Sequence, residues 1–397
     1  MGTAVVRSLH PGYFALVMAT GIVSVGLRDH GLDRPSTGLL WLAAGAYAVL
    51  AAATAGRVVA YRTEVRRDLA DPARGFGMFT FVAGSDVLGV RLAMEGHTAV
   101  AAGLLTVGVA AWSLLGWLVP VTVVRRGPRP LLAGANGTWF IWVVAVQSVA
   151  VLATTLDPVA GAAGGALAVV AVGFWSVGAV CYLVVATLVG LRLVRHRLRP
   201  VDLTPPYWVA MGATAITVLA GTGIATAGRP ALAGVREVAA AISLAYWVLG
   251  TVLIPPLLAA WWWRHVTHRV PLRYEPTWWS IVFPLGMYGV ATRRLGEVAD
   301  LPLVAATGRY ELWLAAAAWT AAFAAMLGSG WSGAAGRGLS RAVAGLAVSR
   351  RAASGSGPGR AAVPGRGRRR AIVPGRGRGR AAEPDPLAPP PAAIPPD

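Results

Sequence analysis

Hydrophobic and polar positions alternate along this chain in long blocks, with apolar runs separated by charged or proline-rich breaks. A bilayer core needs about 20 apolar residues in a helix. A backbone in lipid must satisfy its own hydrogen bonds, which a helix does. The pattern therefore predicts an all-α polytopic membrane protein with ten transmembrane helices. The predicted spans are Gly12–Leu27, Gly38–Ala60, Phe76–Ala93, Thr98–Val119, Gly134–Leu156, Val159–Leu191, Tyr207–Ala227, Val238–Trp263, Trp278–Thr292 and Tyr310–Leu327.

Polar residues are distributed unequally between these spans. The odd-numbered spans carry more hydroxyl and amide side chains than the even-numbered ones. Polar side chains in a bilayer usually face other helices or a water-filled path. We therefore expect five helical hairpins, with the odd helices forming a central pore and the even helices outside. For any single Ser or Thr, the alternative is a hydrogen bond to a carbonyl of its own helix.

The composition agrees with a membrane protein. Of the 397 residues 56% are hydrophobic and 13% are charged, and the mean hydropathy is +0.59. A soluble protein carries roughly twice that charged fraction. These values exclude a disordered chain, a disulfide-rich secreted scaffold and an ordinary cytosolic enzyme. Cys181, the single cysteine, is expected to be a small buried residue. The six histidines lie at segment edges without zinc-site spacing, so we expect no metal and no cofactor.

The positive charge defines two regions and an orientation. All 36 basic residues are arginines, and twelve of them lie between residues 329 and 397. We expect residues 1–328 to form the transmembrane domain and 329–397 a disordered cytoplasmic tail rich in Arg, Gly, Pro and Ala. With both termini in the cytoplasm, sixteen of the other arginines lie inside and eight outside, as the positive-inside rule requires in a cell membrane. The tail lacks interleaved aromatics, which disfavours nucleic acid. Anionic membrane lipid is an expected partner, and a dispensable, solvated tail is the simplest interpretation.

The ninth span contains a helix break. Pro284 cannot donate a backbone hydrogen bond, so the Ser280 carbonyl loses its partner and the helix kinks. Phe283 lies at this break and could plug a narrow path; a purely structural phenylalanine is the alternative. The predicted gate is therefore Phe283 with Pro284.

Small and polar residues in the odd spans are the candidate pore lining. Hydroxyls and amides can donate hydrogen bonds to an anion without trapping it. We expect no cationic side chain at the pore centre, because a buried arginine would hold an anion too tightly, and we expect arginines at the pore mouths. The predicted lining residues are Thr20, Gly21, Gly84, Ser85, Gln147, Thr214, Thr217 and Gly286.

Asp86 lies deep in the third span and has three interpretations. A carboxylate at the bilayer centre costs about 2.5–3.5 kcal/mol on insertion scales. It can form an ion pair with Arg91 or another arginine near a helix end, which is the simplest interpretation. Desolvation can instead keep it protonated by raising its pKa. In the third interpretation, Asp86 takes part in proton coupling.

Several short sequence motifs in the odd-numbered spans resemble motifs of one protein family. His10-Pro-Gly-Tyr-Phe with Ala19-Thr-Gly-Ile-Val-Ser resembles the first helix of the tellurite-resistance and C4-dicarboxylate transporter family, which includes the plant slow anion channels. Similar phrases begin at Phe79, Asn136, Gln147 and Met211. The phrase Trp278-Trp-Ser-Ile-Val-Phe-Pro-Leu-Gly-Met-Tyr resembles the ninth helix of that family. The likeness covers about residues 8–328 and leaves out the tail.

The resemblance implies a fold and a function. It implies ten helices in five hairpins around a pore, a homotrimer, and transport or conduction of anions such as malate and other C4-dicarboxylates, tellurite, sulfite or small inorganic anions. In that family a phenylalanine of the ninth helix occludes the pore, and Phe283 matches it. The sequence therefore predicts an anion channel or transporter and not an enzyme. The alternative is a proton-coupled secondary dicarboxylate transporter that uses Asp86.

Overall fold

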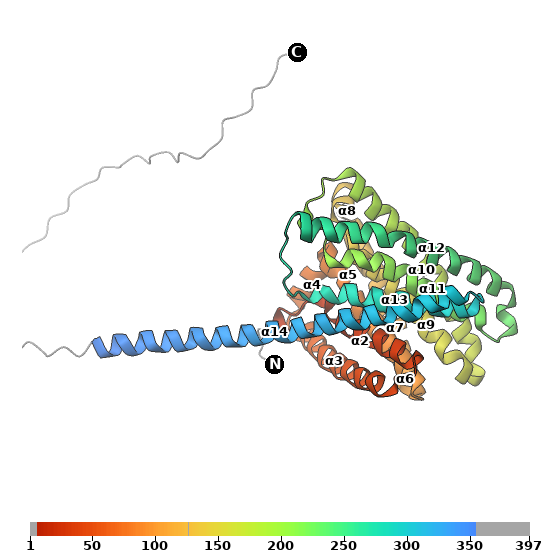
Figure 1. Ribbon diagram of the computed structural model, residues 1–397, viewed down its shortest axis with the longest axis horizontal. Helices are drawn as coiled ribbons and strands as arrows, with labels where there is room; N and C mark the ends of the chain where they lie inside the picture. The colour runs from red at the N-terminus through yellow and green to blue at the C-terminus, as the bar shows by residue number, and fades with distance from the viewer. Residues whose placement is uncertain (1–5, 126, 355–397) are drawn as a thin grey trace, which may run out of the picture. The chain divides into compact units, whose positions relative to one another are not determined.

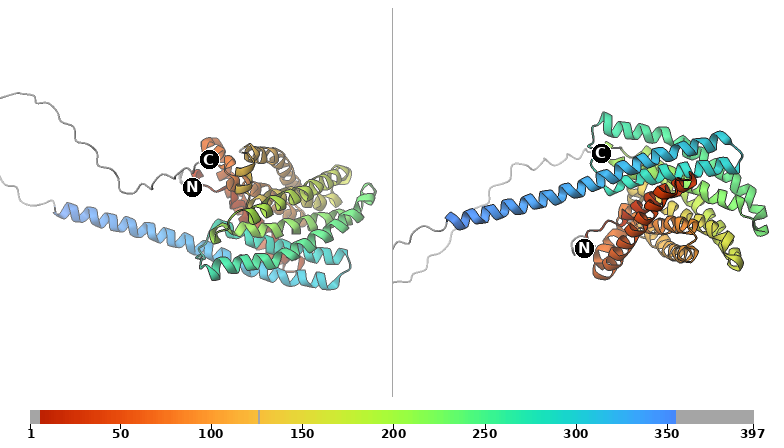
Figure 2. Two further views of the ribbon diagram at one scale, coloured as in Figure 1. Left: turned by 90° about the horizontal axis from the view of Figure 1, so that it is seen from above. Right: turned by 60° about the horizontal axis from the view of Figure 1, so that its bottom comes forward.

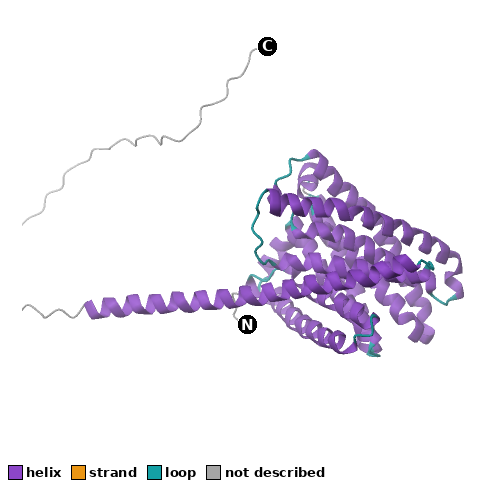
Figure 3. Ribbon diagram, in the orientation of Figure 1, coloured by secondary structure: helices purple, strands orange, loops and turns teal. Residues whose placement is uncertain are grey.

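The computed structural model describes residues 6–125 and 127–354, which form helices and contain no strand (Figure 1, Figure 3). The predicted all-α fold class is confirmed. The α-helices are α2 (Ala15–Asp29), α3 (Asp33–Ala60), α4 (Arg62–Ala70), α5 (Pro72–Gly77), α6 (Phe79–Met94), α7 (Thr98–Val124), α8 (Pro128–Gly134), α9 (Phe140–Leu156), α10 (Gly164–Arg195), α11 (Val209–Thr226), α12 (Ala233–Trp262), α13 (Trp279–Val298) and α14 (Pro302–Ser354). Shorter helical segments are η1 (Pro11–Phe14), η2 (Gly137–Trp139), η3 (Asp157–Val159), η4 (Gly161–Ala163), η5 (Pro200–Asp202), η6 (Pro205–Trp208), η7 (Pro230–Leu232), η8 (Trp263–Thr267) and η9 (Pro276–Trp278).

Contacts divide the chain into two compact units, Met1–Ala335 and Gly336–Asp397. All side-chain contacts described below belong to the first unit. The predicted tail begins at residue 329, inside α14, and residues 355–397 of it lie outside the described residues. The division at residue 328 and the disorder of the tail therefore stay predictions.

Short 3-10 turns begin four of the odd-numbered predicted spans, and their sequences explain why. Proline at the first position of η1 supplies a preset φ angle and lacks an N–H that would otherwise need a partner. The Nδ1 atom of His10 accepts a hydrogen bond from the Gly12 amide at 3.0 Å. Similarly, the Oδ1 atom of Asn136 accepts from the Thr138 amide at 2.9 Å at the start of η2.

Glycines with left-handed backbone conformations end α2 and α6. Gly31 has a φ of 73° and Gly96 a φ of 84°, a region that glycine adopts without steric cost. The amide of the residue after each glycine donates to a carbonyl in the last turn of the helix: Leu32 to Leu27 at 3.0 Å and His97 to Leu92 at 3.0 Å. These turns let α3 return alongside α2, and α7 alongside α6.

Five helices form a closed ring within the described residues. In order around the ring, α2 packs against α6, α6 against α9, α9 against α11, α11 against α13, and α13 against α2. Their N-terminal segments close a second ring in the same order, through η1, α5, η2, η6 and η9. The five ring helices are therefore parallel, with all their N-termini at one end. Figures 1 and 2 show these helices running side by side.

The other long helices surround this ring. Four of them lie against two successive ring helices: α3 against α2 and α6, α7 against α6 and α9, α10 against α9 and α11, and α12 against α11 and α13. The fifth, α14, abuts α2 where Leu312 meets Gly26, and α13 where Gly308 meets Gly289.

Burial separates the inner and outer helices, as the polarity pattern predicts. In the spans that contain α2, α6, α9 and α11, between 72% and 83% of the most apolar window is buried. In the spans that contain α3, α7, α10, α12 and α14 the buried share lies between 17% and 33%. The outer helices thus present apolar side chains to lipid, whereas the ring helices contact mostly protein.

Each of the ten predicted segments lies on a helix, but α13 differs from the others. Nine helices among the described residues are long and apolar enough to cross a membrane, and α13 is not one of them. It carries Pro284, Arg293, Arg294 and Glu297. Because α2, α11, α12 and α14 pack around it, α13 needs little apolar surface toward lipid. The count of ten spans and their pairing as five hairpins stay predictions.

Candidate functional site

A small cavity lies inside the ring. Its volume is about 20 Å³, which is room for about one water molecule. All five ring helices contribute to its wall, and Ser148 of α9 supplies the one hydroxyl among the described lining residues. The lining consists of Ile22 and Val25 of α2, Val87 and Val90 of α6, Ser148 and Val151 of α9, Ile216 and Leu219 of α11, and Met287 of α13.

Phe283 lies one helical turn before Met287 on α13. Residues four apart share a helix face, so Phe283 lies on the same side of α13 as Met287, toward the N-terminal end of the ring, but it is not among the described lining residues. It is buried, with 1% of its surface exposed. Beside it, a Cβ atom at Gly212 of α11 would lie only 2.9 Å from Cγ of Pro284. Glycine at position 212 therefore permits the close approach of α11 to α13 at Pro284; α13 runs as one helix through this proline, and the kink stays a prediction.

The predicted lining hydroxyls are directed at outer helices rather than at this cavity. The Trp319 indole of α14 donates to Oγ1 of Thr20 at 3.0 Å. Ser85 donates to the Phe81 carbonyl at 2.8 Å and shares a 2.8 Å hydrogen bond with the Tyr47 hydroxyl of α3. Neither Thr20 nor Ser85 is among the described lining residues.

Gln147 and Thr214 are also directed at outer helices, whereas the Thr217 hydroxyl bonds its own helix. The Gln147 amide donates to the Trp175 carbonyl of α10 at 3.1 Å. Thr214 donates to the Met211 carbonyl at 2.7 Å, and its hydroxyl abuts Gly250 of α12. Thr217 donates to the Ala213 carbonyl at 2.8 Å. The interpretation in which Thr hydroxyls bond carbonyls of their own helix thus describes both threonines.

The three predicted lining glycines mark close contacts between helices. A Cβ atom at Gly21 would lie 2.7 Å from Cγ1 of Val87, and one at Gly286 would lie 2.9 Å from Cγ2 of Ile22. Val87 and Ile22 both line the cavity. Gly84 instead faces Phe14, at 3.4 Å from its Cβ. Gly21 and Gly286 therefore set how closely the ring packs around its axis, and Gly84 seats α6 on η1.

Asp86 is buried directly behind Ser148. The Ser148 hydroxyl lies 2.7 Å from Oδ2 of Asp86 and 2.8 Å from the Ala145 carbonyl, and can donate to either. The other carboxyl oxygen, Oδ1, is buried without a hydrogen-bond partner and faces Gly108 of α7. No ion pair to Asp86 occurs within the described part of the chain.

Arg91 does not form the expected pair with Asp86. Its Nη1 atom lies 2.7 Å from Oε1 of Glu95, and its Nε and Nη2 atoms donate to the Ser24 and Ser36 hydroxyls at 2.9 and 2.8 Å. Residues five apart on a helix point in different directions, whereas residues four apart share a face, so Glu95 is within reach and Asp86 is not. The hydrogen bond from Arg91 lowers the pKa of the Glu95 carboxyl. Arg91 therefore joins α2, α3 and α6.

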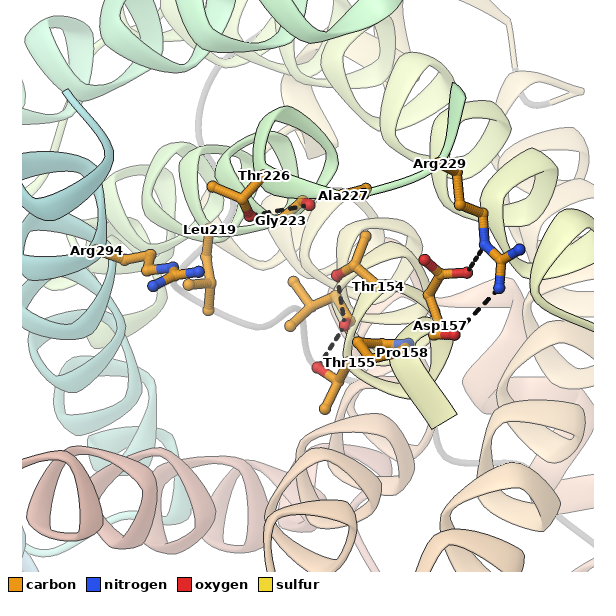
Figure 4. Close-up of a pocket in the computed structure, with 12 residues that line it drawn as sticks. Thr154, Thr155, Asp157, Pro158, Leu219, Gly223, Thr226, Ala227, Arg229 and Arg294 are labelled. Atoms are coloured by element: carbon orange, nitrogen blue, oxygen red, sulfur yellow. Dashed lines mark hydrogen bonds and ion pairs between the residues drawn. The ribbon is translucent and has the colours of Figure 1, made fainter. Parts of the chain in front are cut away.

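A larger cavity of about 540 Å³ lies at the C-terminal ends of the ring helices, and we call it the vestibule (Figure 4). Val151 and Leu219 line both the vestibule and the central cavity, so the two are adjacent along the ring axis. The vestibule is lined by Val151, Thr154, Thr155, Asp157, Pro158, Leu219, Gly223, Thr226, Ala227, Gly228, Arg229 and Arg294.

The vestibule carries three charged side chains. Arg229 forms an ion pair with the Asp157 carboxylate, and its Nη2 atom lies 3.3 Å from the Asp157 carbonyl. Arg294 projects from the opposite side of the cavity (Figure 4). Its nearest acid, Glu297, is 3.8 Å away and is held by Arg293 at 2.9 Å. The lining thus has a net charge of one positive unit.

Sequence reasoning missed this group and one further carboxyl. Arg229 and Arg294 appeared only as loop charges, and Asp157 not at all. The available signal was an Asp-Pro and an Arg-Pro pair at the ends of two odd spans. Glu311, within the tenth predicted span, was also missed; it lies against Gly289 of α13. No group of three or more His, Cys, Asp and Glu residues that could hold a metal ion occurs among the residues searched, those the structure describes.

Comparison with known proteins agrees with the predicted class. A family model described as voltage-dependent anion channel (SLAC1) matches residues 8–327. An uncharacterized membrane protein of Mycobacterium tuberculosis H37Rv is 57% identical over 147 residues, which are 37% of this chain and 75% of that protein. An uncharacterized transporter of Methanocaldococcus jannaschii is 22% identical over 317 residues, which are 78% of this chain and 90% of that protein.

Proposed function

The chain belongs to the voltage-dependent anion channel family, and from this premise we propose that small anions cross the membrane along the axis of the five-helix ring, with Phe283 as the gate. The observation that carries the proposal is that two adjacent cavities lie within the ring, and we infer that Phe283 follows them along the same path. The cavities are the vestibule with its excess positive charge and the central cavity that shares two residues with it, and Phe283 lies one turn before Met287 of the central cavity on α13.

The size and polarity of the central cavity suit a closed state. An anion without water in apolar surroundings is prohibitively unfavourable, and a space for about one water molecule cannot hold a hydrated anion. Conduction therefore needs the ring to widen. Pro284 removes one helical hydrogen bond beside Phe283, so α13 can bend there at lower cost than elsewhere. A change at this kink would move the Phe283 side chain away from the axis.

The proposed substrates are the anions that the resemblance implies: malate and other C4-dicarboxylates, tellurite, sulfite or similar small anions. We propose a homotrimer in the cell membrane with both termini in the cytoplasm. The arginine bias of the predicted loops supports this orientation.

The test is anion flux through purified protein in liposomes. Chloride, sulfite, tellurite and malate are supplied in turn, with and without a pH gradient. We expect flux of at least one anion, and we expect Phe283→Ala to raise it about ten-fold or more, because removing the ring opens the path. Phe323→Ala is the matched control, since Phe323 stacks on Trp319 of the outer helix α14. Unchanged flux in Phe283→Ala, with normal folding, would remove the gate from the proposal.

A proton-coupled dicarboxylate transporter is the second candidate, and Asp86 is the observation that favours it. Its carboxyl is buried without a cation partner in the described residues and is one hydrogen bond from Ser148, which lines the cavity. If transport is coupled to protons, Asp86→Asn should abolish anion uptake driven by a pH gradient. Exchange of anions between the two sides of the membrane without a pH gradient should continue. If Asp86→Asn changes only the yield of folded protein, the channel interpretation stands.

A further inference from the structure

Arg229 holds the vestibule wall together through its Nε and Nη2 atoms. It bonds the Asp157 carboxylate, and its Nη2 atom lies within 3.3 Å of the Asp157 carbonyl and 3.5 Å of the Gly161 carbonyl. The guanidinium rests on the backbone of Gly164, where a Cβ atom would collide with it. Arg229 therefore ties the loop after α11 to the start of α10. Its charge is balanced by Asp157.

Arg294 has no comparable partner. It makes no hydrogen bond within the described part of the chain, and 47% of its side-chain surface is exposed. Its acidic neighbours are Glu297, which is closer to Arg293, and Asp29 at the end of α2, which interacts electrostatically with both arginines. Figure 4 shows Arg294 and the Arg229–Asp157 pair on opposite sides of the vestibule. The guanidinium of Arg294 thus has donors that make no hydrogen bond within the described residues, and because it shares Glu297 with Arg293, its positive charge is only partly compensated.

The threonine hydroxyls of the vestibule already donate to backbone carbonyls. The hydroxyls of Thr154 and Thr155 donate to the Val151 carbonyl at 2.9 and 2.8 Å, and Thr226 donates to the Thr222 carbonyl at 2.9 Å. The C-terminal ends of the parallel ring helices add partial negative charge at this end. An anion that enters here therefore depends on Arg294.

We propose that the vestibule is an anion-binding site in which Arg294 holds one singly charged anion, and that Asp157 sets this charge preference by neutralising Arg229. The proposal rests on the proposed transport function and narrows its substrate class. The physical reason is charge balance. One free positive unit neutralises a monovalent anion but leaves a dicarboxylate with one uncompensated charge, and solvation cost rises with the square of the charge. The neutral complex moves more easily toward the apolar cavity.

Liposome flux at low ionic strength tests the proposal, with chloride as the monovalent probe and malate as the divalent probe. Arg294→Gln should raise the apparent KM for chloride about two- to five-fold, with maximal flux unchanged, and the effect should shrink as salt is added. Arg34→Gln is the matched control. It removes an exposed arginine at the start of α3, which is not part of the vestibule lining.

Substitution at Asp157 changes the charge in the other direction. Asp157→Asn releases Arg229 and should raise the ratio of malate to chloride flux several-fold. The double variant Asp157→Asn with Arg229→Gln restores a net charge of one and should return the wild-type ratio. The selectivity is expected to follow the net charge of the lining rather than any one residue.

The outcomes separate the two proposals. If the wild-type protein moves none of the anions, the transport function itself fails. If it moves chloride or malate but Arg294→Gln leaves both the KM and the flux ratio unchanged, the vestibule proposal alone is overturned. Arg294 is half exposed and its one ion pair, with Glu297, is long at 3.8 Å, so Arg294→Gln decides the matter even if Asp157→Asn folds poorly.

Discussion

The ring and the outer layer differ in what their side chains must do. The outer helices are apolar and exposed, because they meet lipid, whereas the ring helices are buried and carry most of the buried hydroxyls, the Gln147 amide and Asp86. Yet most of these polar groups point outward, at the outer helices, and the central cavity is mainly aliphatic. The polar side chains of the ring helices therefore serve mainly to connect the ring to the outer helices.

The same comparison separates two kinds of arginine. Arg91 is fully buried in the ring and joins three helices, while Arg294 stands half exposed at the vestibule. The first is held on several sides by hydroxyls and a carboxylate, which fixes its position. The second has donors to spare for a ligand. The two arginines of the ring thus differ in burial and in their number of hydrogen-bond partners. This difference separates a structural arginine, Arg91, from a candidate anion-binding arginine, Arg294.

The largest expected effect comes from the buried cation of the ring. Arg91→Met leaves Glu95 and the Ser24 and Ser36 hydroxyls without their partner, and we expect a loss of about 3–5 kcal/mol of unfolding free energy. Arg34→Met, at an exposed position of the outer helix α3, should change stability by less than about 0.5 kcal/mol. Thermal unfolding in detergent measures both. If Arg91→Met and Arg34→Met lowered the unfolding free energy equally, the proposed difference between buried ring positions and exposed outer positions would be wrong.

A glycine pair tests the packing of the ring against that of the outer layer. A Cβ atom at Gly137, where η2 meets η6, would lie 2.5 Å from backbone atoms of Pro206 and Tyr207. Gly137→Ala should therefore cost about 1–3 kcal/mol in unfolding free energy. At Gly45 of α3 a Cβ atom meets open space. Gly45→Ala should be neutral or stabilise by up to about 1 kcal/mol, through helix propensity. A stable Gly137→Ala variant would show that the ring ends are loosely packed.

The smallest effects distinguish a hydroxyl between the layers from the hydroxyl at the cavity. Thr20→Val removes the acceptor of the Trp319 indole and should cost about 1 kcal/mol, with anion flux and selectivity unchanged. Ser148→Ala should have a similar effect on stability but should also alter the flux, since Ser148 lines the cavity. If Thr20→Val changed the anion flux and Ser148→Ala did not, the permeation path would not run through the central cavity.

The sequence by itself determined the all-helical class and the inner and outer sets of helices. These follow from composition summed over whole segments, because a helix that meets lipid must be apolar and a helix shielded from lipid need not be. The family resemblance, which was based on short sequence motifs in the odd-numbered spans, agrees with the family model that matches residues 8–327.

Only the tertiary structure decided which way each ring side chain points. A helix buried on all sides has no apolar face to reveal its rotation, so Thr20 and Gln147 could not be distinguished from Ser148 by sequence pattern. The partner of Asp86 and the pairing of Arg229 with Asp157 across 72 positions depend on which helices become neighbours. Closure of the ring brings these residues together, and closure is a property of contacts between helices rather than of any one segment.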